Sequence, residues 1–386
     1  MQVDVAIVGA GLVGASLARS LAQSGLSLAV VEGAPPPERA QDWDARIYAL
    51  SPGNVAFLET LGAWGALDRS RVCPVRAMRI FGDDGRSHME FSAYEVGVNE
   101  LAWIVESGEL QRALWLLLER QSNLSLVFPA RPVSLDLGAD AATLGTDGGQ
   151  SIKSRLLVGA DGANSWVRQE AGFEADAKPY GEQGVVANFT CERPHRGIAL
   201  QWFRADGVLA YLPLPGERIS IVWSTNDANA AELTSMPPEE FCTRVAQAGA
   251  GMLGKLELIT PPAAFALTHL AVRDIAKPRL ALVGDAAHVV HPLAGQGVNL
   301  GFGDARALAA ALQDPAARRD PGDYLLLRRF ARSRAEDILA MRLVTDGLQR
   351  LFRARQPWVA RLRNLGLNLT DAVPVIKTML ARRAMS

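Results

Sequence analysis

The sequence lacks the features that mark membrane-spanning, secreted and nucleic-acid-binding chains. It has no uninterrupted apolar run of about 18 residues, which a bilayer-spanning helix requires. Its three cysteines, Cys73, Cys191 and Cys242, are far apart, so the sequence predicts neither a disulfide framework nor a metal site. A formal net charge of −1 argues against a nucleic acid partner. With no basic signal segment at the N-terminus, we expect a reduced, cytoplasmic compartment.

Glycine is abundant, and its first cluster lies in residues 3–32. VAIVG is typical of a buried parallel strand, and Gly9, Gly11 and Gly14 follow as Gly-x-Gly-x-x-Gly before a helix and a second strand ending at Glu32. The three glycines allow a tight turn, a close approach to a pyrophosphate and close packing of helix on strand. Glu32 should accept hydrogen bonds from a ribose, which favours FAD or NAD over NADP. The alternative is a strand–helix turn with no ligand.

Two later segments repeat the pattern of an apolar strand followed by an acid. RLLVGADG ends at Asp161 and Gly162, and RLALVGD ends at Gly284 and Asp285. Each acid follows the carboxyl end of a strand, where open α/β sheets bind ligands. A simple NAD enzyme needs no such late segment, whereas a cofactor with a ribityl chain does. We therefore expect FAD, with Asp285 bonded to the ribityl hydroxyls.

These segments, in this order and spacing, carry a family resemblance. The glycine motif, GADG and GDAAHVVHPLAGQGVN resemble the single-component, class A flavoprotein aromatic hydroxylases over the length of the chain. The third motif, DARIYALSPGN at 44–54 and the C-terminal RLRNLGLNLTDAVPVIKTMLARRAM are similar to the ubiquinone-biosynthesis hydroxylases within that group. The resemblance implies FAD as cofactor and NAD(P)H as co-substrate.

The resemblance also implies roles for three charged side chains. Arg46 is expected at the FAD diphosphate or at an incoming nicotinamide, with a surface salt bridge as the alternative. Arg112 matches a position that often holds the FAD phosphates, against a solvated helix face. Asp161 is expected to support both flavin and NAD(P)H, to cap the following helix, or to do both.

The glycine-rich stretch of the third motif is expected to lie against the flavin ring. Small, adaptable backbone there would contact the pyrimidine edge, and the helix that begins there would stabilise the negative charge of reduced flavin. We expect His288 and His291 to be packed structural residues, and we assign no catalytic side chain because the cofactor carries the chemistry. The predicted contacts of this stretch are Pro292, Gly295, Gln296, Gly297, Val298 and Asn299, with Pro292, Gly295 and Gly297 at the ring.

The predicted fold is α/β, a discontinuous Rossmann-like FAD-binding domain of the glutathione-reductase type with an inserted antiparallel sheet. Alternating segments with turn signals such as PGE predict the sheet, and a hairpin is expected around Asp84-Gly85. Trp202, Tyr211 and Trp223 are expected in its core rather than in a pocket. The expected FAD-binding domain comprises 1–74, 101–182 and 273–324, the substrate domain 75–100 and 183–272, and a helical C-terminal region 325–386.

The resemblance implies a monooxygenase of class EC 1.14.13.-, in which NAD(P)H reduces FAD and O2 adds at C4a. The resulting hydroperoxide then hydroxylates the ring of a polyprenyl phenol or benzoquinol. Two alternatives stay open, a hydroxylase of a small soluble aromatic compound and a non-catalytic flavin-binding accessory protein.

Residues 325–386 carry 13 Lys and Arg against 4 Asp and Glu, a net charge of +9. This basic region either docks on the flavin domain or contacts a biosynthetic complex or the inner face of the membrane.

Overall fold

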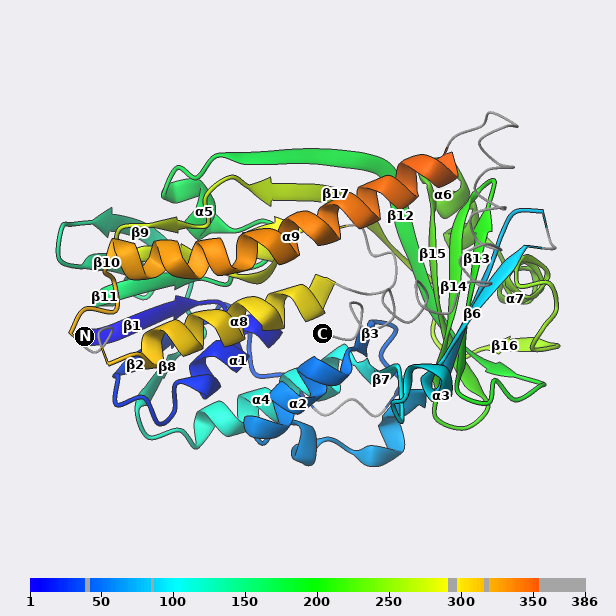
Figure 1. The fold of residues 1–386 in the computed structure, drawn as a ribbon, viewed down its shortest axis with the longest axis horizontal. Coiled ribbons are helices and arrows are strands. Elements are labelled where there is room, and N and C mark those ends of the chain that lie inside the picture. Colours follow the sequence, from blue (N-terminus) through cyan, green and yellow to red (C-terminus); the bar gives the residue numbers. More distant parts are fainter. Residues whose placement is uncertain (39–41, 85–86, 291–296, 316–318, 354–386) are drawn as a thin grey trace.

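Two large sheets and one small sheet organise the chain (Figure 1). The computed structural model describes residues 1–38, 42–84, 87–290, 297–315 and 319–353. No helix in these ranges has the length and apolar character needed to cross a bilayer.

The first sheet is the mainly parallel one expected of a nucleotide-binding half. Its order is β18-β19-β11-β1-β2-β8, with β10 and β9 attached beside β11. The carboxyl ends of its parallel strands share one edge, and the first two fingerprints follow β1 and β11 directly at that edge. The strands are β1 (Gln2–Val8), β2 (Leu28–Val31), β8 (Leu124–Val127), β9 (Pro132–Leu137), β10 (Ala142–Thr146), β11 (Ser151–Gly159), β18 (Ala276–Lys277) and β19 (Leu280–Leu282).

Helices cover this sheet and bury its apolar strands in one continuous core. α1 packs against both α4 and α8, and α8 in turn packs against the long α9 (Figure 1). Because α9 begins the predicted C-terminal region, that region contacts the nucleotide-binding half through α8 and β18. The helices are α1 (Leu12–Ser20), α2 (Pro52–Thr60), α4 (Ser107–Glu119), α5 (Trp166–Glu170), α8 (Gly297–Gln313) and α9 (Tyr324–Arg353), whereas the short α3 (Ala93–Val96) lies beside β6 of the second sheet.

The second sheet has the order β20-β17-β12-β15-β14-β13-β5-β6, with β16 beside β12. Its pairs are antiparallel as expected, except that β13 and β5 run parallel. Its strands are β5 (Ala77–Phe81), β6 (His88–Ser92), β12 (Ala175–Cys191), β13 (Ile198–Arg204), β14 (Gly207–Leu214), β15 (Arg218–Asn226), β16 (Leu256–Leu258), β17 (Ala263–Val272) and β20 (His288–Val289).

The long strand β12 connects the two halves. It runs without interruption through residues 182 and 183, where we placed a domain boundary, and its pairing with β17 shifts register between Pro179 and Gln183. The division into domains stays a prediction, because one strand belongs to both sides of it.

The two faces of the second sheet differ in their packing. Trp202, Tyr211 and Trp223 lie in a core between one face and the helices α6 (Asp227–Ser235) and α7 (Pro238–Ala248), which confirms the core interpretation. The other face meets the small sheet of β3 (Ile47–Leu50), β4 (Cys73–Val75) and β7 (Ala102–Glu106).

A buried hydrogen bond ties α7 to the second sheet. The Tyr211 hydroxyl donates to the Val245 carbonyl at 2.5 Å, and the side chain is 2% exposed. We expect Tyr211→Phe to lower the free energy of unfolding by about 1 kcal/mol because the Val245 carbonyl loses one of its two donors and keeps only the Gly249 N–H. Urea denaturation measures this loss, with Tyr94→Phe as the control because Tyr94 is 92% exposed. Equal midpoints for the two variants would contradict the assignment.

Candidate functional site

The first two fingerprints touch through their glycine backbones. Gly9 has φ of +101°, and a methyl group there would overlap the carbonyl oxygen of Ala160 in the GADG segment. A methyl group on Gly14 would overlap the carbonyl oxygen of Gly9. A methyl group on Gly11 would meet no atom within 4 Å. Gly9 and Gly14 are therefore required by packing, whereas Gly11 faces open space beside the start of α1.

This open space is suited to a phosphate. Gly11 is the N-cap of α1 and has no side chain to cap the helix, so the partial positive charge of the helix end faces outward. At the end of β2, the Glu32 carboxylate accepts hydrogen bonds from the N–H groups of Ala10 at 2.7 Å and Ala34 at 2.8 Å. Glu32 thus braces the turn as well as lying where a ribose hydroxyl would approach.

Gln111 is a site residue that our sequence reasoning missed. Its side-chain amide on α4 donates to the carbonyl of Ala10 in the glycine turn. Arg112, its neighbour, is half-buried and has no hydrogen-bond or ion-pair partner within the described ranges. Its guanidinium is therefore available to a ligand, in keeping with the prediction that it holds phosphate. The only sequence signal for Gln111 is its position next to Arg112.

The second and third fingerprints are joined by Arg168. This side chain is 6% exposed and donates to the carbonyls of Ala286 at 3.0 Å and Ala163 at 2.7 Å. Burial lowers the pKa of Arg168, and the nearby Asp161 opposes that effect. Its two carbonyl bonds partly compensate the buried charge.

Asp161 takes the capping role that we considered for it. Its carboxylate accepts hydrogen bonds from the Ser165 hydroxyl at 2.6 Å and the Val167 N–H at 3.0 Å, both at the start of α5. Gly162 follows with φ of +81°, a conformation that favours glycine. The predicted contacts of Asp161 and Gly162 with flavin or NAD(P)H stay predictions.

The third fingerprint returns to the first through Val13. Gly284 has φ of +62°, and a methyl group there would lie 3.1 Å from Val13 of α1. A methyl group on Gly301 of α8 would lie 2.6 Å from the same side chain. The side chain of Val13 therefore fits between two glycines, and three segments far apart in the chain form one edge.

Asp285 is the acid at this edge whose carboxylate is left without a partner. It is half-buried and forms no hydrogen bond within the part of the chain that the structure describes. Burial raises the pKa of Asp285, while His288 and Arg46 act to lower it. A buried carboxylate with unused acceptors fits a row of ribityl hydroxyls, which would donate to it.

Arg46 lies close enough to Asp285 to influence that carboxylate electrostatically. It is exposed, and its guanidinium lies 5.6 Å from the centroid of the Tyr48 ring. The backbone before it is fixed by the buried Glu106, which accepts from the Asp44 N–H at 2.6 Å and pairs with Arg71. The Arg46 guanidinium forms no ion pair within the described ranges, and its diphosphate or nicotinamide contact stays a prediction.

The start of α8 carries the last group of predicted residues. Gly297 has open space beside it, and Val298 is 9% exposed. The Asn299 side chain accepts from the Ser51 N–H at 3.0 Å and donates to the Ala49 carbonyl at 2.8 Å, which ties α8 to the 44–54 segment. Any flavin contact from Asn299 would therefore come from its backbone. Pro292, Gly295, Gln296 and His291 lie outside the described residues.

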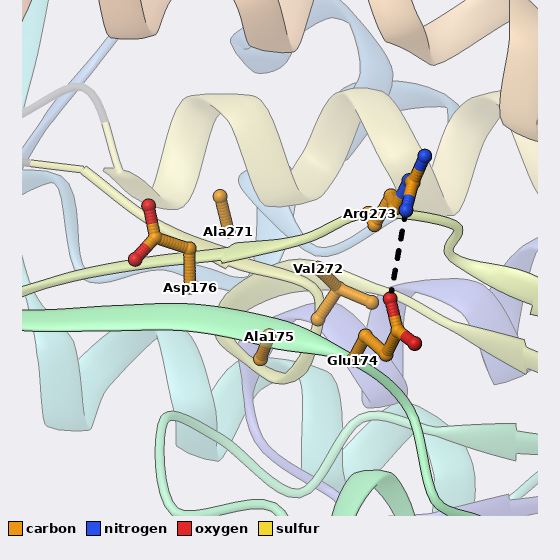
Figure 2. Close-up of a pocket in the computed structure, with 6 residues that line it drawn as sticks. All are labelled: Glu174, Ala175, Asp176, Ala271, Val272 and Arg273. Atoms are coloured by element: carbon orange, nitrogen blue, oxygen red, sulfur yellow. Dashed lines mark ion pairs between the residues drawn. The ribbon is translucent and has the colours of Figure 1, made fainter.

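A separate surface hollow lies on the β12–β17 ribbon (Figure 2). Glu174 and Arg273 face each other across it at 3.7 Å, and both side chains are about 80% exposed. Such an exposed pair is screened by water and offers little binding energy. None of the described fingerprint residues lines this hollow, so the glycine-rich edge is the candidate site.

The contrast between Gly11 and Gly14 provides a test of the cradle. We expect Gly11→Ala to fold with an unchanged melting temperature as apoprotein but to bind FAD at least tenfold more weakly, because its methyl group enters only ligand space. We expect Gly14→Ala to destabilise the apoprotein itself. Thermal melts and flavin fluorescence titrations separate the two effects, and unchanged FAD affinity in Gly11→Ala would rule out the cradle.

The raised pKa of Asp285 gives a pH prediction. Because the folded apoprotein holds this proton at higher pH than the unfolded chain, its unfolding free energy should fall as pH rises from about 4 through the raised pKa. Asp285→Asn should remove that fall, yet weaken FAD binding by about tenfold because a charged acceptor is lost. Apoprotein melts from pH 4 to 8 and FAD titrations measure both effects; tighter FAD binding in the variant would contradict the role.

The chain is similar to known proteins over nearly its whole length. The FAD binding domain family matches residues 2–336. The chain is 35% identical to 3-demethoxyubiquinol 3-hydroxylase of Escherichia coli, covering 99% of this chain and 98% of that protein. It is also 35% identical to ubiquinone hydroxylase UbiL of Rhodospirillum rubrum, covering 99% and 89%. Among solved structures, PqsL of Pseudomonas aeruginosa superposes with a TM-score of 0.79 at 23% identity, covering 94% of this chain and 100% of that one.

The residues present fit the cofactor that the family implies. The uncapped start of α1 and Arg112 suit the phosphates, and Asp285 suits the ribityl chain, since neither side chain has a hydrogen-bond partner among the described residues. FAD is the cofactor, and NAD(P)H is the co-substrate typical of this group. The chain therefore belongs to the FAD binding domain family and is an FAD-dependent monooxygenase.

Proposed function

We propose that this monooxygenase hydroxylates the aromatic ring of a polyprenylated phenol or benzoquinol in ubiquinone biosynthesis. NAD(P)H is the reductant and O2 the oxidant. The full-length similarity to two ubiquinone-pathway hydroxylases supports the substrate class. The main support for the proposal is the polarity of the side chains on one face of the second sheet. This face points toward the nucleotide-binding half.

That face is identified by strand register and by one hydrogen bond across the halves. Asn188 on β12 donates to the carbonyl of Asp44, just before Arg46, at 2.9 Å. Neighbouring strands place their alternate side chains on the same face as Asn188, opposite the tryptophan-rich core. On this face, Met78, Ala199 and Leu212 pack against the small sheet. The remaining central members are Ile80, Val186, Gln201, Phe203, Val208, Ala210, Ser220, Val222 and Ser224.

These central positions are apolar or neutral. Val222 and Ala210 are only half-buried, so apolar surface is left for a ligand to cover. The charged members, Glu182 and Arg218, stand at opposite ends, and Arg218 lies 5.3 Å from the Trp43 ring. A neutral prenylated ring matches this face, whereas a salicylate-type acid would bury its carboxylate without a cation at the centre.

The chain's own residues bind the cofactor, orient the aromatic ring and shield the site from water. FAD supplies the redox and oxygen-activating chemistry when bound. The start of α1, Arg112 and Asp285 hold its phosphates and ribityl chain, and Arg46 offers a cation at the mouth where the nicotinamide would arrive. The neutral face of the second sheet holds the ring and keeps water away, which limits wasteful release of peroxide.

A matched pair of substitutions tests the substrate face. In a strain lacking this gene, we expect an under-hydroxylated prenylated intermediate to accumulate, and its structure identifies the ring carbon. The wild-type chain should restore ubiquinone. Ala210→Asp should restore at least tenfold less ubiquinone, because it places a carboxylate on the neutral face. Ala231→Asp, at an exposed position on α6, should restore it.

Quinone profiling by mass spectrometry and the FAD content of each purified variant are the measurements. Normal ubiquinone in the deletion strain, with lost growth on an aromatic acid, would favour the small soluble substrate. A yellow protein that never oxidises NAD(P)H in the presence of a prenylated phenol would favour the accessory role.

A substrate of this class resides in the bilayer, and α9 offers a surface to reach it. Leu325, Leu339 and Leu343 are more than half exposed, and Arg329 and Arg332 are exposed along the same helix. Apolar side chains beside arginines suit the inner face of an anionic membrane. The protein would then bind the surface peripherally and reach its substrate there.

Vesicle binding tests the surface contact. We expect sedimentation with vesicles containing phosphatidylglycerol, and about 30-fold weaker binding for the double variant Arg329→Ser, Arg332→Ser, at about 1 kcal/mol per arginine. The control is Arg193→Ser with Arg244→Ser, two exposed arginines of the second-sheet region. Equal binding to neutral phosphatidylcholine vesicles, or equal losses in both double variants, would refute the contact.

A further inference from the structure

Beneath the candidate site lies a buried charged cluster that the predicted contacts do not include. Asp304 of α8 is fully buried, with His288 3% exposed on one side and Arg334 of α9 7% exposed on the other. The Asp304 carboxylate lies 2.6 Å from His288 Nε2 and accepts from Arg334 Nε at 2.8 Å. We call these three residues the Asp304 cluster.

The Asp304 cluster holds the turn that presents Asp285. The Asp304 oxygen that contacts His288 also accepts from the N–H of Gly284 at 2.9 Å. Gly284 has φ of +62° and directly precedes Asp285. The position of the Asp285 carboxylate therefore depends on Asp304, which accepts from Gly284 and lies 20 residues after it in the chain.

Arg334 brings the C-terminal helix into the same arrangement. It also donates to the carbonyl of Leu300 at 3.3 Å and pairs with Asp337 at 2.5 Å. Gly303 makes room for it, because a methyl group there would lie 2.6 Å from the guanidinium. The arginine thus reaches α8 and the carboxylate through a gap that a larger residue would close.

Charge explains why Arg334 matters to Asp285. Burial alone would raise the pKa of Asp304, but His288 and Arg334 hold it below its usual range. The negative charge of Asp304 in turn opposes ionisation of Asp285. If Arg334 were lost, the buried Asp304 charge would be undercompensated and Asp304 would take up a proton more readily, so its hydrogen bond to the Gly284 N–H just before Asp285 would weaken.

We propose that Arg334 and Asp304 are positioning residues of the flavin site, through which the C-terminal helix α9 sets the Asp285 carboxylate toward the ribityl chain. Helix α9 is then part of the cofactor site and not only a docked tail. The proposal rests on FAD binding and is independent of the substrate that the enzyme hydroxylates.

A matched pair of arginines tests the proposal. Arg279 pairs with Asp320 just before α9 and is 12% exposed in its side chain, against 8% for Arg334. Both arginines tether the C-terminal segment, but of the two only Arg334 is connected, through Asp304, to the turn before Asp285. Arg279→Met should lower the melting temperature of apoprotein and holoprotein together and leave the FAD dissociation constant unchanged.

Arg334→Met should raise the FAD dissociation constant by about tenfold and shrink the rise in melting temperature that FAD produces. Arg334→Lys, which keeps the charge, should recover part of the affinity. Flavin fluorescence titration of the full-length apoprotein and paired melts are the readouts. Equal FAD affinities in Arg334→Met and Arg279→Met would overturn the proposal.

If Arg334→Met fails to fold, Asp304→Asn provides the second variant. It preserves shape and an acceptor oxygen but removes the charge, so it should still weaken FAD binding by more than Arg279→Met does. Wild-type FAD affinity in a folded Asp304→Asn would equally overturn the proposal.

Discussion

Backbone-to-backbone contact at a few glycines holds the flavin site together. The carbonyls of Gly9 and Ala160 occupy the places where side chains of Gly14 and Gly9 would stand, and Val13 fills the space left by Gly284 and Gly301. Parallel strands bring three distant segments to one edge, but only the missing side chains let them touch. The cofactor cradle therefore results from close packing at Gly9 and Gly14. The space beside Gly11, at the start of α1, stays open.

Three acidic residues follow three strands of the first sheet, and they differ in their hydrogen-bond partners. Glu32 accepts from two backbone N–H groups and braces the glycine turn. Both carboxylate oxygens of Asp161 accept hydrogen bonds at the start of α5. Asp285 is half-buried and forms no hydrogen bond within the described residues, and His288 and Arg46 lie near enough to lower its pKa. The uncommitted carboxylate is the one best placed to bind a polyhydroxyl chain.

Much of the site was predictable because its signals are local. A strand, a glycine turn and a helix within about 30 residues define the cradle before any tertiary contact is known. The core positions of Trp202, Tyr211 and Trp223 followed from strand alternation. Alternation could not say which face of the second sheet turns toward the nucleotide-binding half, since both faces are largely apolar. That answer required Asn188 and its bond to the 44–54 segment.

Sequence patterns did not predict the side-chain contacts between segments far apart in the chain. Gln111 touches the glycine turn from α4, and Arg334 reaches Asp304 from α9; neither shows a motif. At 23% identity PqsL keeps the same fold, so that backbone architecture tolerates wide change in side chains. In our proposals, substrate specificity comes from the side chains on the neutral face, and Arg334 and Asp304 set the geometry of the cofactor site. The two can vary independently, because no residue of the Asp304 cluster belongs to that face.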